Sequence, residues 1–358
     1  MSEPGARIRA GERVAIFADG WFDTDNGKAG HALLRYGPRP VVCVIDRSHA
    51  GETAEQVIPY AANDAPIVAT VAEAAALGAE VLAIGVAPAG GKLPPEWKAA
   101  LLEALSLGIH VEAGLHDELA NDPELRAAAA ASGRDLRDLR VAPSGLSTPT
   151  GRAFGLPVSI VHAVGSDCAI GKMTAVLELT RAAQAADARA VFVPTGQVGV
   201  SVAGWGIAVD HVIADYIAGA AERLVVEGAE RGDVLLVEGQ GAIYHPAYSG
   251  VTLGLLHGCV PHVLVLCHLA GATHVDEWDD VPIPPLAEVI ELYERIAAPI
   301  RPARVAAIVL NTRHITDVDD ARRECARIEL ETGLVCDDPV RFGADRLWQA
   351  VSEALPAR

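Results

Sequence analysis

Positive charge is scarce in this sequence. It has 29 Lys and Arg residues against 47 Asp and Glu residues, which gives a formal net charge of −18. A chain with this balance repels polyanions, so we expect neither nucleic acid nor an anionic membrane as a partner. An anionic small ligand would need local groups to hold it, because the overall field opposes binding.

Long hydrophobic runs, cysteine pairs and secretion signals are also missing. No apolar stretch reaches the roughly 20 residues needed to cross a membrane, and Val260–Leu269 reads as a buried strand. Residues 1–13 are polar and charged, unlike a signal peptide. The six cysteines lack C-x-x-C spacing, which favours reduced thiols. We therefore expect a cytoplasmic protein.

Several catalytic signatures are absent. Without H-E-x-x-H or G-x-S-x-G, nothing supports zinc-protease or serine-hydrolase chemistry. No G-x-G-x-x-G follows the first strand, so the first half lacks the dinucleotide fingerprint. The His and Cys residues between His257 and His268 fit no zinc spacing, and we predict no metal site.

Composition and pattern predict two α/β domains. The 358 residues are 51% hydrophobic and only 4% aromatic, which suits close helix–sheet packing. Short apolar strands such as Val41–Asp46 and Val81–Val86 alternate with helical segments, predicting a doubly wound parallel sheet. A stretch rich in Pro, Ser, Gly and Thr near residues 142–152 marks the boundary, giving domains 1–145 and 146–358.

The most informative stretch is a strand, a glycine turn and a helix. Val158–Val164 reads as a buried strand, GSDCAIGK follows it, and a helical pattern begins at Met173. Such a turn gathers backbone N–H groups, a helix N-terminus and a lysine around a phosphate. The P-loop pattern is imperfect. Gly165 is one residue early and Met173 occupies the magnesium-binding hydroxyl position, with Thr174 beside it, so we expect phosphate binding and doubt a magnesium site.

Three further strands end in polar residues. TGQVG follows the strand at Ala190–Pro194, EGQG follows Asp233–Val237, and Asn311 closes Val305–Leu310. Parallel strands bring such ends to one sheet edge, where ligands bind. The predicted cofactor-binding residues are Gly165, Ser166, Asp167, Cys168, Gly171, Lys172, Met173, Thr174, Gln197, Gln240 and Asn311.

The polar loop from Glu238 to Ser249 holds the candidate catalytic residues. Glu238 could bind metal, orient water or act as a base, or could simply be satisfied by the amides of its glycine turn. His245 is a candidate base because its ordinary pKa is near neutral, or it is a hydrogen-bonded loop residue. The predicted catalytic set is Glu238, His245, Tyr248 and Ser249.

These loops are similar to those of dethiobiotin synthetase and its P-loop relatives, and the chain more closely resembles domain-of-unknown-function family 1611. The resembling pieces are IDRSHAGETA, IGVAPAGGKLP, GSDCAIGKMT, VEGQGAIYHPAYSGVTLGLLHG, VPIPPL, LNT and DPVRFG. The resemblance implies a Rossmann-like N-terminal domain and a P-loop NTPase-like C-terminal domain with a mainly parallel sheet. Characterised members look like D-glutamate N-acetyltransferases that use acetyl-coenzyme A. One departure is Ala272, where the family pattern leads us to expect arginine.

This resemblance implies acetyl-coenzyme A as co-substrate and an acidic amino acid, D-glutamate first, as acceptor. Lys172 would hold a phosphate, and Glu238 or His245 would be the base. The amides of Gly239–Gly241, or the hydroxyls of Tyr248 and Ser249, would stabilise the oxyanion. Candidate cations for the acceptor are Lys92, Arg47 and Arg341.

Two alternatives remain open. One is an ATP- and magnesium-dependent ligase or kinase like dethiobiotin synthetase, in which Thr174 would reach the metal. The other is a nucleotide-binding regulatory protein. By analogy with P-loop proteins that pair across the phosphate site, we also expect a homo-oligomer.

Overall fold

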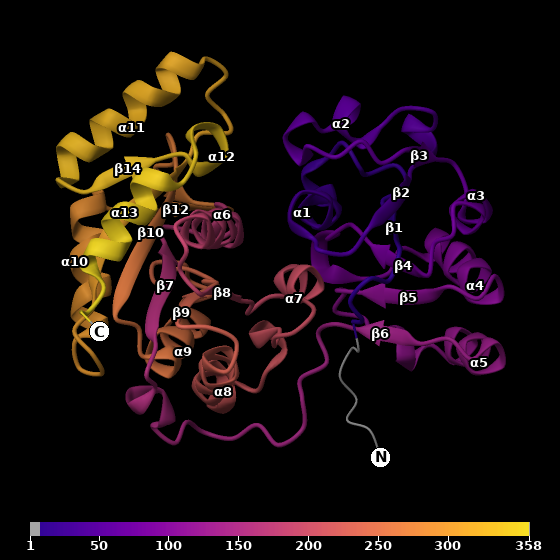
Figure 1. The fold of residues 1–358 in the computed structure, drawn as a ribbon, viewed down its shortest axis with the longest axis horizontal. Helices are drawn as coiled ribbons and strands as arrows, with labels where there is room; N and C mark the ends of the chain where they lie inside the picture. Colours follow the sequence, from indigo (N-terminus) through magenta and orange to yellow (C-terminus); the bar gives the residue numbers. More distant parts are fainter. Residues whose placement is uncertain (1–7, 358) are drawn as a thin grey trace. The chain divides into compact units, whose positions relative to one another are not determined.

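The computed structural model describes residues 8–357, which form two α/β units (Figure 1). One unit holds the chain up to Ser144 together with Gln197–His211. The other holds Gly145–Gly196 and the chain from Val212 onward. The expected fold class is confirmed, since every strand of both large sheets pairs in parallel.

The first unit is a doubly wound sheet in the order β3-β2-β1-β4-β5-β6. Helix α1 lies on one face of this sheet and α3, α4 and α5 on the other (Figure 1). The strands are β1 (Val14–Phe17), β2 (Val41–Ile45), β3 (Ile67–Val68), β4 (Val81–Ile84), β5 (His110–Ala113) and β6 (Leu136–Asp138). The helices are α1 (Lys28–Tyr36), α2 (Ala54–Val57), α3 (Val71–Ala76), α4 (Lys98–Ser106), α5 (Pro123–Ser132) and α7 (Gln197–Ala203).

A buried ion pair fixes α7 to the first unit. Arg39 donates to both carboxylate oxygens of Glu112 on β5, at 3.0 and 2.8 Å. Arg39 also donates to the carbonyl oxygen of Ser201 on α7, and the Ser201 hydroxyl donates to Glu112. Charged side chains this deeply buried are stable only when paired, so α7 completes the polar interior of a domain from which it is remote in sequence.

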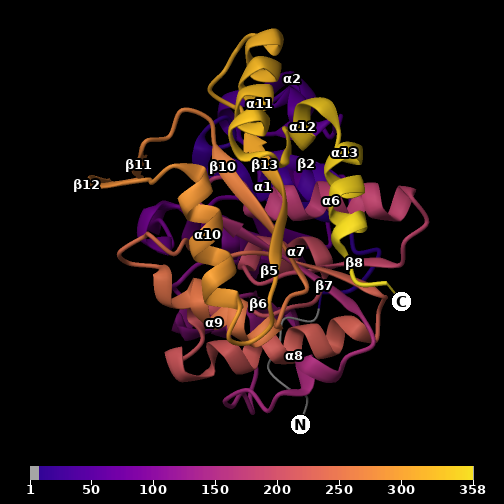
Figure 2. The same cartoon turned by 90° about the vertical axis from the view of Figure 1, so that its left-hand side faces the viewer.

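The second unit has a sheet in the order β14-β13-β10-β7-β9-β8. Helices α6 and α13 pack together on one face, and α8, α9 and α10 cover the other (Figures 1 and 2). The strands are β7 (Ser159–Gly165), β8 (Ala190–Val193), β9 (Val234–Val237), β10 (Val263–Leu269), β13 (Arg304–Asn311) and β14 (Val335–Asp337). The helices are α6 (Lys172–Ala185), α8 (Ile217–Ala229), α9 (Ser249–Cys259), α10 (Leu286–Ala297), α11 (Val318–Thr332), α12 (Pro339–Phe342) and α13 (Asp345–Ala354).

Strand β7 holds the start of the predicted phosphate-binding turn. All seven of its residues are buried, and it pairs with β10 on one side and β9 on the other. A strand covered on both faces reads as a continuous apolar run, which is how Val158–Val164 could be recognised in the sequence. Its carboxyl end delivers Gly165 to the edge where β9, β10 and β13 also end.

Two features of the fold were not among the expected elements. The first is the edge strand β6 at residues 136–138, which follows helix α5, whose N-cap Asp122 accepts from two amides. Between β10 and α10 the chain forms an unexpected hairpin of β11 (His274–Val275) and β12 (Trp278–Pro282), which extends outward from the sheet (Figure 2). Among the described residues, no helix is both long and apolar enough to cross a bilayer.

Candidate functional site

The turn after β7 is a cradle of unused backbone donors. Helix α6 starts at Lys172 and has Gly171 as its N-cap, with a φ of 103°. Within the described residues, the consecutive amides from Ala169 to Thr174 donate to no acceptor. Converging N–H groups at a helix N-terminus attract anions, so the geometry fits a phosphate group.

Lys172 lies inside this cradle. Its ammonium donates to the carbonyl oxygen of Asp167 at 2.6 Å, and burial lowers its pKa. Asn311 supports the turn from the end of β13 by donating to the carbonyl oxygen of Ile170 at 3.0 Å. Ser166 is hydrogen-bonded to Nδ1 of His268 at 2.8 Å. The loop is therefore braced by side chains from β10 and β13 while its amides stay open.

Glu238 is a buried carboxyl group at the end of β9. Its Oε2 accepts from the amides of Thr195 at 2.8 Å and Gly196 at 3.1 Å, and Gln240 donates to Oε1 at 3.3 Å. Burial raises the pKa of Glu238 to about 7, although these amides and Lys172 act in the opposite direction. A carboxyl group with a pKa near neutrality suits proton transfer.

The amides that bond Glu238 come from the loop after β8, not from its own glycine turn. Within the described residues, the amides of Gly239, Gln240 and Gly241 have no acceptor. A Cβ atom at Gly239 would approach the carbonyl oxygen of Ala163 to 1.9 Å, so only glycine fits. These free donors beside an acid–base group are what a developing oxyanion requires.

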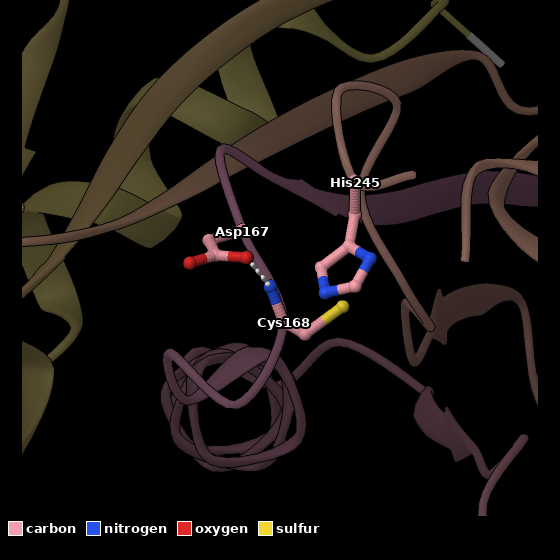
Figure 3. A group of neighbouring side chains, drawn as sticks. All are labelled: Asp167, Cys168 and His245. Carbon is pink, nitrogen blue, oxygen red and sulfur yellow. Dashed lines mark hydrogen bonds between the residues drawn. The ribbon is translucent and has the colours of Figure 1, made fainter. Parts of the chain in front are cut away.

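The hydrogen bonds of His245 favour a role as a hydrogen-bond donor over a role as a general base. Its Nδ1 accepts the amide proton of Ala247 at 3.1 Å. The neutral ring therefore carries its proton on Nε2, and protonating Nδ1 would break this bond. In Figure 3 the ring lies beside Cys168 and Asp167 of the phosphate loop, and one donor atom from each of the three lies within 4.8 Å of the others.

These three side chains are of types that can bind a metal ion. Burial raises the pKa of Cys168 to about 11, so in the absence of a metal it is a thiol at neutral pH. Asp167 accepts from the amides of Cys168 at 2.6 Å and Asp276 at 2.7 Å. The carboxylate of Asp167 therefore anchors the loop.

Replacing His245 tests its donor role. We expect His245→Gln to keep most activity, because the glutamine amide can donate from the position of Nε2, whereas His245→Ala should lower kcat about tenfold by removing a hydrogen bond of about 1.4 kcal/mol. Steady-state kinetics on both variants would measure this. A general base would give equal losses in Gln and Ala.

Tyr293 on α10 is a supporting residue that the sequence did not reveal. Its buried hydroxyl donates to the carbonyl oxygen of Gly165 at 2.7 Å and accepts the amide of Ile243 at 3.0 Å. One side chain thus joins the start of the phosphate loop to the loop that carries Glu238. A tyrosine within an amphipathic helix has no distinguishing pattern, so no sequence signal could have identified it.

Removing this hydroxyl should destabilise the second unit. We expect Tyr293→Phe to cost about 1–3 kcal/mol, because it leaves a buried amide and a buried carbonyl without their partner. Thermal and urea unfolding of variant and wild type would measure the loss. Unchanged stability would mean that another group replaces the hydroxyl.

The remaining predicted residues fall into two groups. Tyr248 stacks near the His245 ring at 4.5 Å between centroids, Ser249 starts α9, and Met173 and Thr174 lie in the first turn of α6. Gln197 instead lies on α7 in the first unit, where its side chain packs against Gly114. Its role as a cofactor ligand stays a prediction.

The three cations suggested for the acceptor have different surroundings. Arg47 pairs with Asp19 at 2.7 Å, and Arg341 donates to the backbone carbonyls of Thr312 and Ile315. Lys92 is exposed in the loop after β4. Arg341 is therefore held in place by the backbone of its own unit, and none of these assignments gains specific support.

Known proteins resemble the chain over most of its length. A D-glutamate N-acetyltransferase from Tritonibacter scottomollicae is 38% identical over 285 residues, covering 79% of this chain and 84% of that protein. One from a Pseudoalteromonas species is 36% identical over 279 residues, covering 78% and 83%. A crystal structure of a DUF1611 family protein from Anabaena variabilis is 43% identical, with a TM-score of 0.90 over 96% of this chain and 99% of that one.

Family models match both halves. Residues 147–348 match the P-loop domain described as "Domain of unknown function (DUF1611_C)", and residues 47–142 match the corresponding Rossmann-like N-terminal domain. The expected family is confirmed, as is its pairing of a Rossmann-like with a P-loop domain. The chain belongs to the DUF1611 family.

Proposed function

We propose that this protein is an N-acetyltransferase that moves the acetyl group of acetyl-coenzyme A to the amino group of an acidic amino acid, with D-glutamate as the first candidate. The observation that carries the proposal is the pairing of a phosphate cradle with Glu238, whose pKa is raised to about 7. The two similar proteins named D-glutamate N-acetyltransferase support the acyl acceptor.

The residues divide the reaction between them. The amides from Ala169 to Thr174 and Lys172 would bind a phosphate of coenzyme A. Glu238 takes a proton from the acceptor's ammonium group, and the amine nitrogen then attacks the thioester carbonyl carbon. The amides of Gly239–Gly241 or Nε2–H of His245 would donate to the oxyanion. When the C–S bond breaks, Glu238 returns this proton to the leaving thiolate. The freed carboxylate then takes the second proton from the nitrogen, which becomes a neutral amide, and releases it to solvent.

Binding and turnover test this proposal together. We would titrate the protein calorimetrically with acetyl-coenzyme A and, separately, with ATP plus magnesium. We would then follow thiol release with D-glutamate, L-glutamate and D-aspartate as acceptors. Acetyl-coenzyme A binding with acceptor-dependent thiol release would support the transferase. Binding of ATP only, dependent on magnesium, would favour the ligase or kinase, and nucleotide binding without any turnover would favour a regulatory protein.

We also propose that the protein acts as a homo-oligomer, by analogy with P-loop proteins that pair across the phosphate site. Light scattering after gel filtration would measure the mass. A monomer at assay concentration, with full activity, would remove this part of the proposal.

A further inference from the structure

Two exposed aromatic side chains flank His245 beside the phosphate loop. Tyr248 is 53% exposed and Trp278 is 43% exposed, in a chain with only 4% aromatic residues. Their ring centroids lie 4.5 and 6.4 Å from that of His245, which itself approaches Asp167 and Cys168 of the loop. Large aromatic surfaces left exposed next to a binding loop indicate a contact surface for a ligand.

The hairpin that carries Trp278 is tied directly to the phosphate loop. The amide of Asp276, at the turn between β11 and β12, donates to Asp167 at 2.7 Å. Asp167 also accepts from Cys168, so one carboxylate fixes both the loop and the hairpin. Trp278 is therefore held by the phosphate loop itself, although the hairpin extends outward from the sheet (Figure 2).

Charged residues are unevenly distributed along the carboxyl edge of the second unit's sheet, where the phosphate loop lies. No Lys or Arg occurs between residues 232 and 294, a range that includes Glu238, His245, Tyr248 and the whole hairpin. The hairpin instead carries Asp276, Glu277, Asp279 and Asp280. Arg313 follows β13 and Arg341 follows β14, the two strands beyond β10 in the sheet order. Phosphate groups outside the cradle are therefore disfavoured beside Tyr248 and the acidic hairpin and favoured toward the ends of β13 and β14.

We infer that Tyr248 and Trp278 form the wall that packs against the pantetheine arm of the acyl donor. This arm is an uncharged chain of methylene and amide groups that joins the diphosphate of coenzyme A to its thioester. It suits an aromatic wall without cations, and it leads from the cradle toward the free amides of Gly239–Gly241 and Nε2–H of His245. The anionic nucleotide half would then lie toward Arg313 and Arg341. This inference rests on the proposed function.

The test compares coenzyme A with its nucleotide half, 3′-phospho-ADP, which lacks the arm. We expect Trp278→Ala and Tyr248→Ala each to weaken coenzyme A binding about tenfold and to leave 3′-phospho-ADP affinity unchanged, as measured by calorimetry. Tyr248→Phe should bind coenzyme A like wild type, because the ring and not the hydroxyl forms the wall. Phe154→Ala is the matched control, since Phe154 is 51% exposed in the same unit but far in sequence from these loops.

Each outcome separates the hypotheses. Equal weakening of both ligands would mean that the rings stack on adenine, and no weakening of either would mean that they contact no part of the donor; both results overturn the inference. If wild type binds coenzyme A and acetylates an amine but the Ala variants bind coenzyme A with wild-type affinity, only the inference about the aromatic wall fails. If wild type binds neither ligand, the proposed function fails and the wall fails with it.

Discussion

Glu238→Gln is expected to lower kcat by at least about 10²-fold while leaving acetyl-coenzyme A binding intact, because general acid–base catalysis contributes about 10²–10⁴-fold. Glutamine keeps an oxygen that accepts from the amides of Thr195 and Gly196, so the loop geometry should persist. It cannot take a proton from the acceptor's ammonium group. Stopped-time acetylation assays and calorimetry on the same preparation would measure the two quantities.

The pH dependence gives this prediction a second readout. Glu238 has a pKa of about 7, so wild-type kcat/KM should fall as pH drops from 8 to 6, where the carboxyl group is protonated and cannot act as a base. The residual kcat/KM of Glu238→Gln should not show this fall between pH 8 and pH 6. Glu222→Gln is the matched control, since Glu222 is also buried and accepts backbone amides but lies away from the loop. If kcat/KM of Glu238→Gln fell with pH as it does in wild type, a residue other than Glu238 would be the general base.

The pH dependence of folding stability should reveal the titration of the same carboxyl group in the absence of substrate. The folded protein holds the proton of Glu238 more tightly than the unfolded chain, whose pKa is near 4.5. Folding stability contributed by this group therefore falls as pH rises from about 4.5 to about 7. Glu238→Gln removes that loss, so its melting temperature relative to wild type should rise across this interval. A constant difference would mean that the carboxyl group titrates normally.

Lys172→Met is expected to weaken acetyl-coenzyme A binding roughly 10- to 100-fold, the equivalent of the ~1.5–3 kcal/mol of a hydrogen bond to a charged group. Methionine keeps the apolar stem that packs in the buried turn and removes only the ammonium group. The effect should appear in the dissociation constant and KM more than in kcat, because the role that we propose for the lysine is to bind a phosphate and not to react. Calorimetry with wild type and variant would measure it.

Lys28→Met provides a close control for this lysine. Lys28 is also the first residue of a helix, α1, but it is exposed and lies in the first unit. It should bind the donor like wild type. If Lys172→Met retains full affinity, the amides of the turn hold the phosphate without the lysine. If it binds normally but loses kcat instead, the ammonium group acts on the reacting atoms.

The fold was largely predictable because its signals are local. Buried parallel strands such as β7 and β9 are continuous apolar runs, and the glycine turn before Lys172 marks a helix start. Strand β6 was missed because its residues, Leu136–Asp138, are mostly charged and form strand only by pairing with β5. The β11–β12 hairpin was missed because its acidic residues carry no alternation of apolar and polar side chains.

The site was predictable in its loops but not in its roles. Glu238, Lys172 and Gln240 follow strands in a recognisable pattern, and the structure brings them to one sheet edge. The donor role that we propose for His245 depends on the amide of Ala247 two residues away, which no residue type encodes. Tyr293 and Trp278 reach the site from α10 and the hairpin, and only the folded chain gives their distance from the loop.

The return of Gln197–His211 to the first unit has a consequence for biosynthesis. Arg39 and Glu112 emerge from the ribosome long before Ser201, yet their buried ion pair includes both the hydroxyl and the carbonyl of that serine. In a nascent chain ending near Ser144, this ion pair would be exposed to solvent. Such a chain would also lack Asp210, the partner of Arg140. The first domain therefore cannot finish folding until β7, α6 and β8 of the second have been translated, so its folding overlaps the synthesis of the second domain.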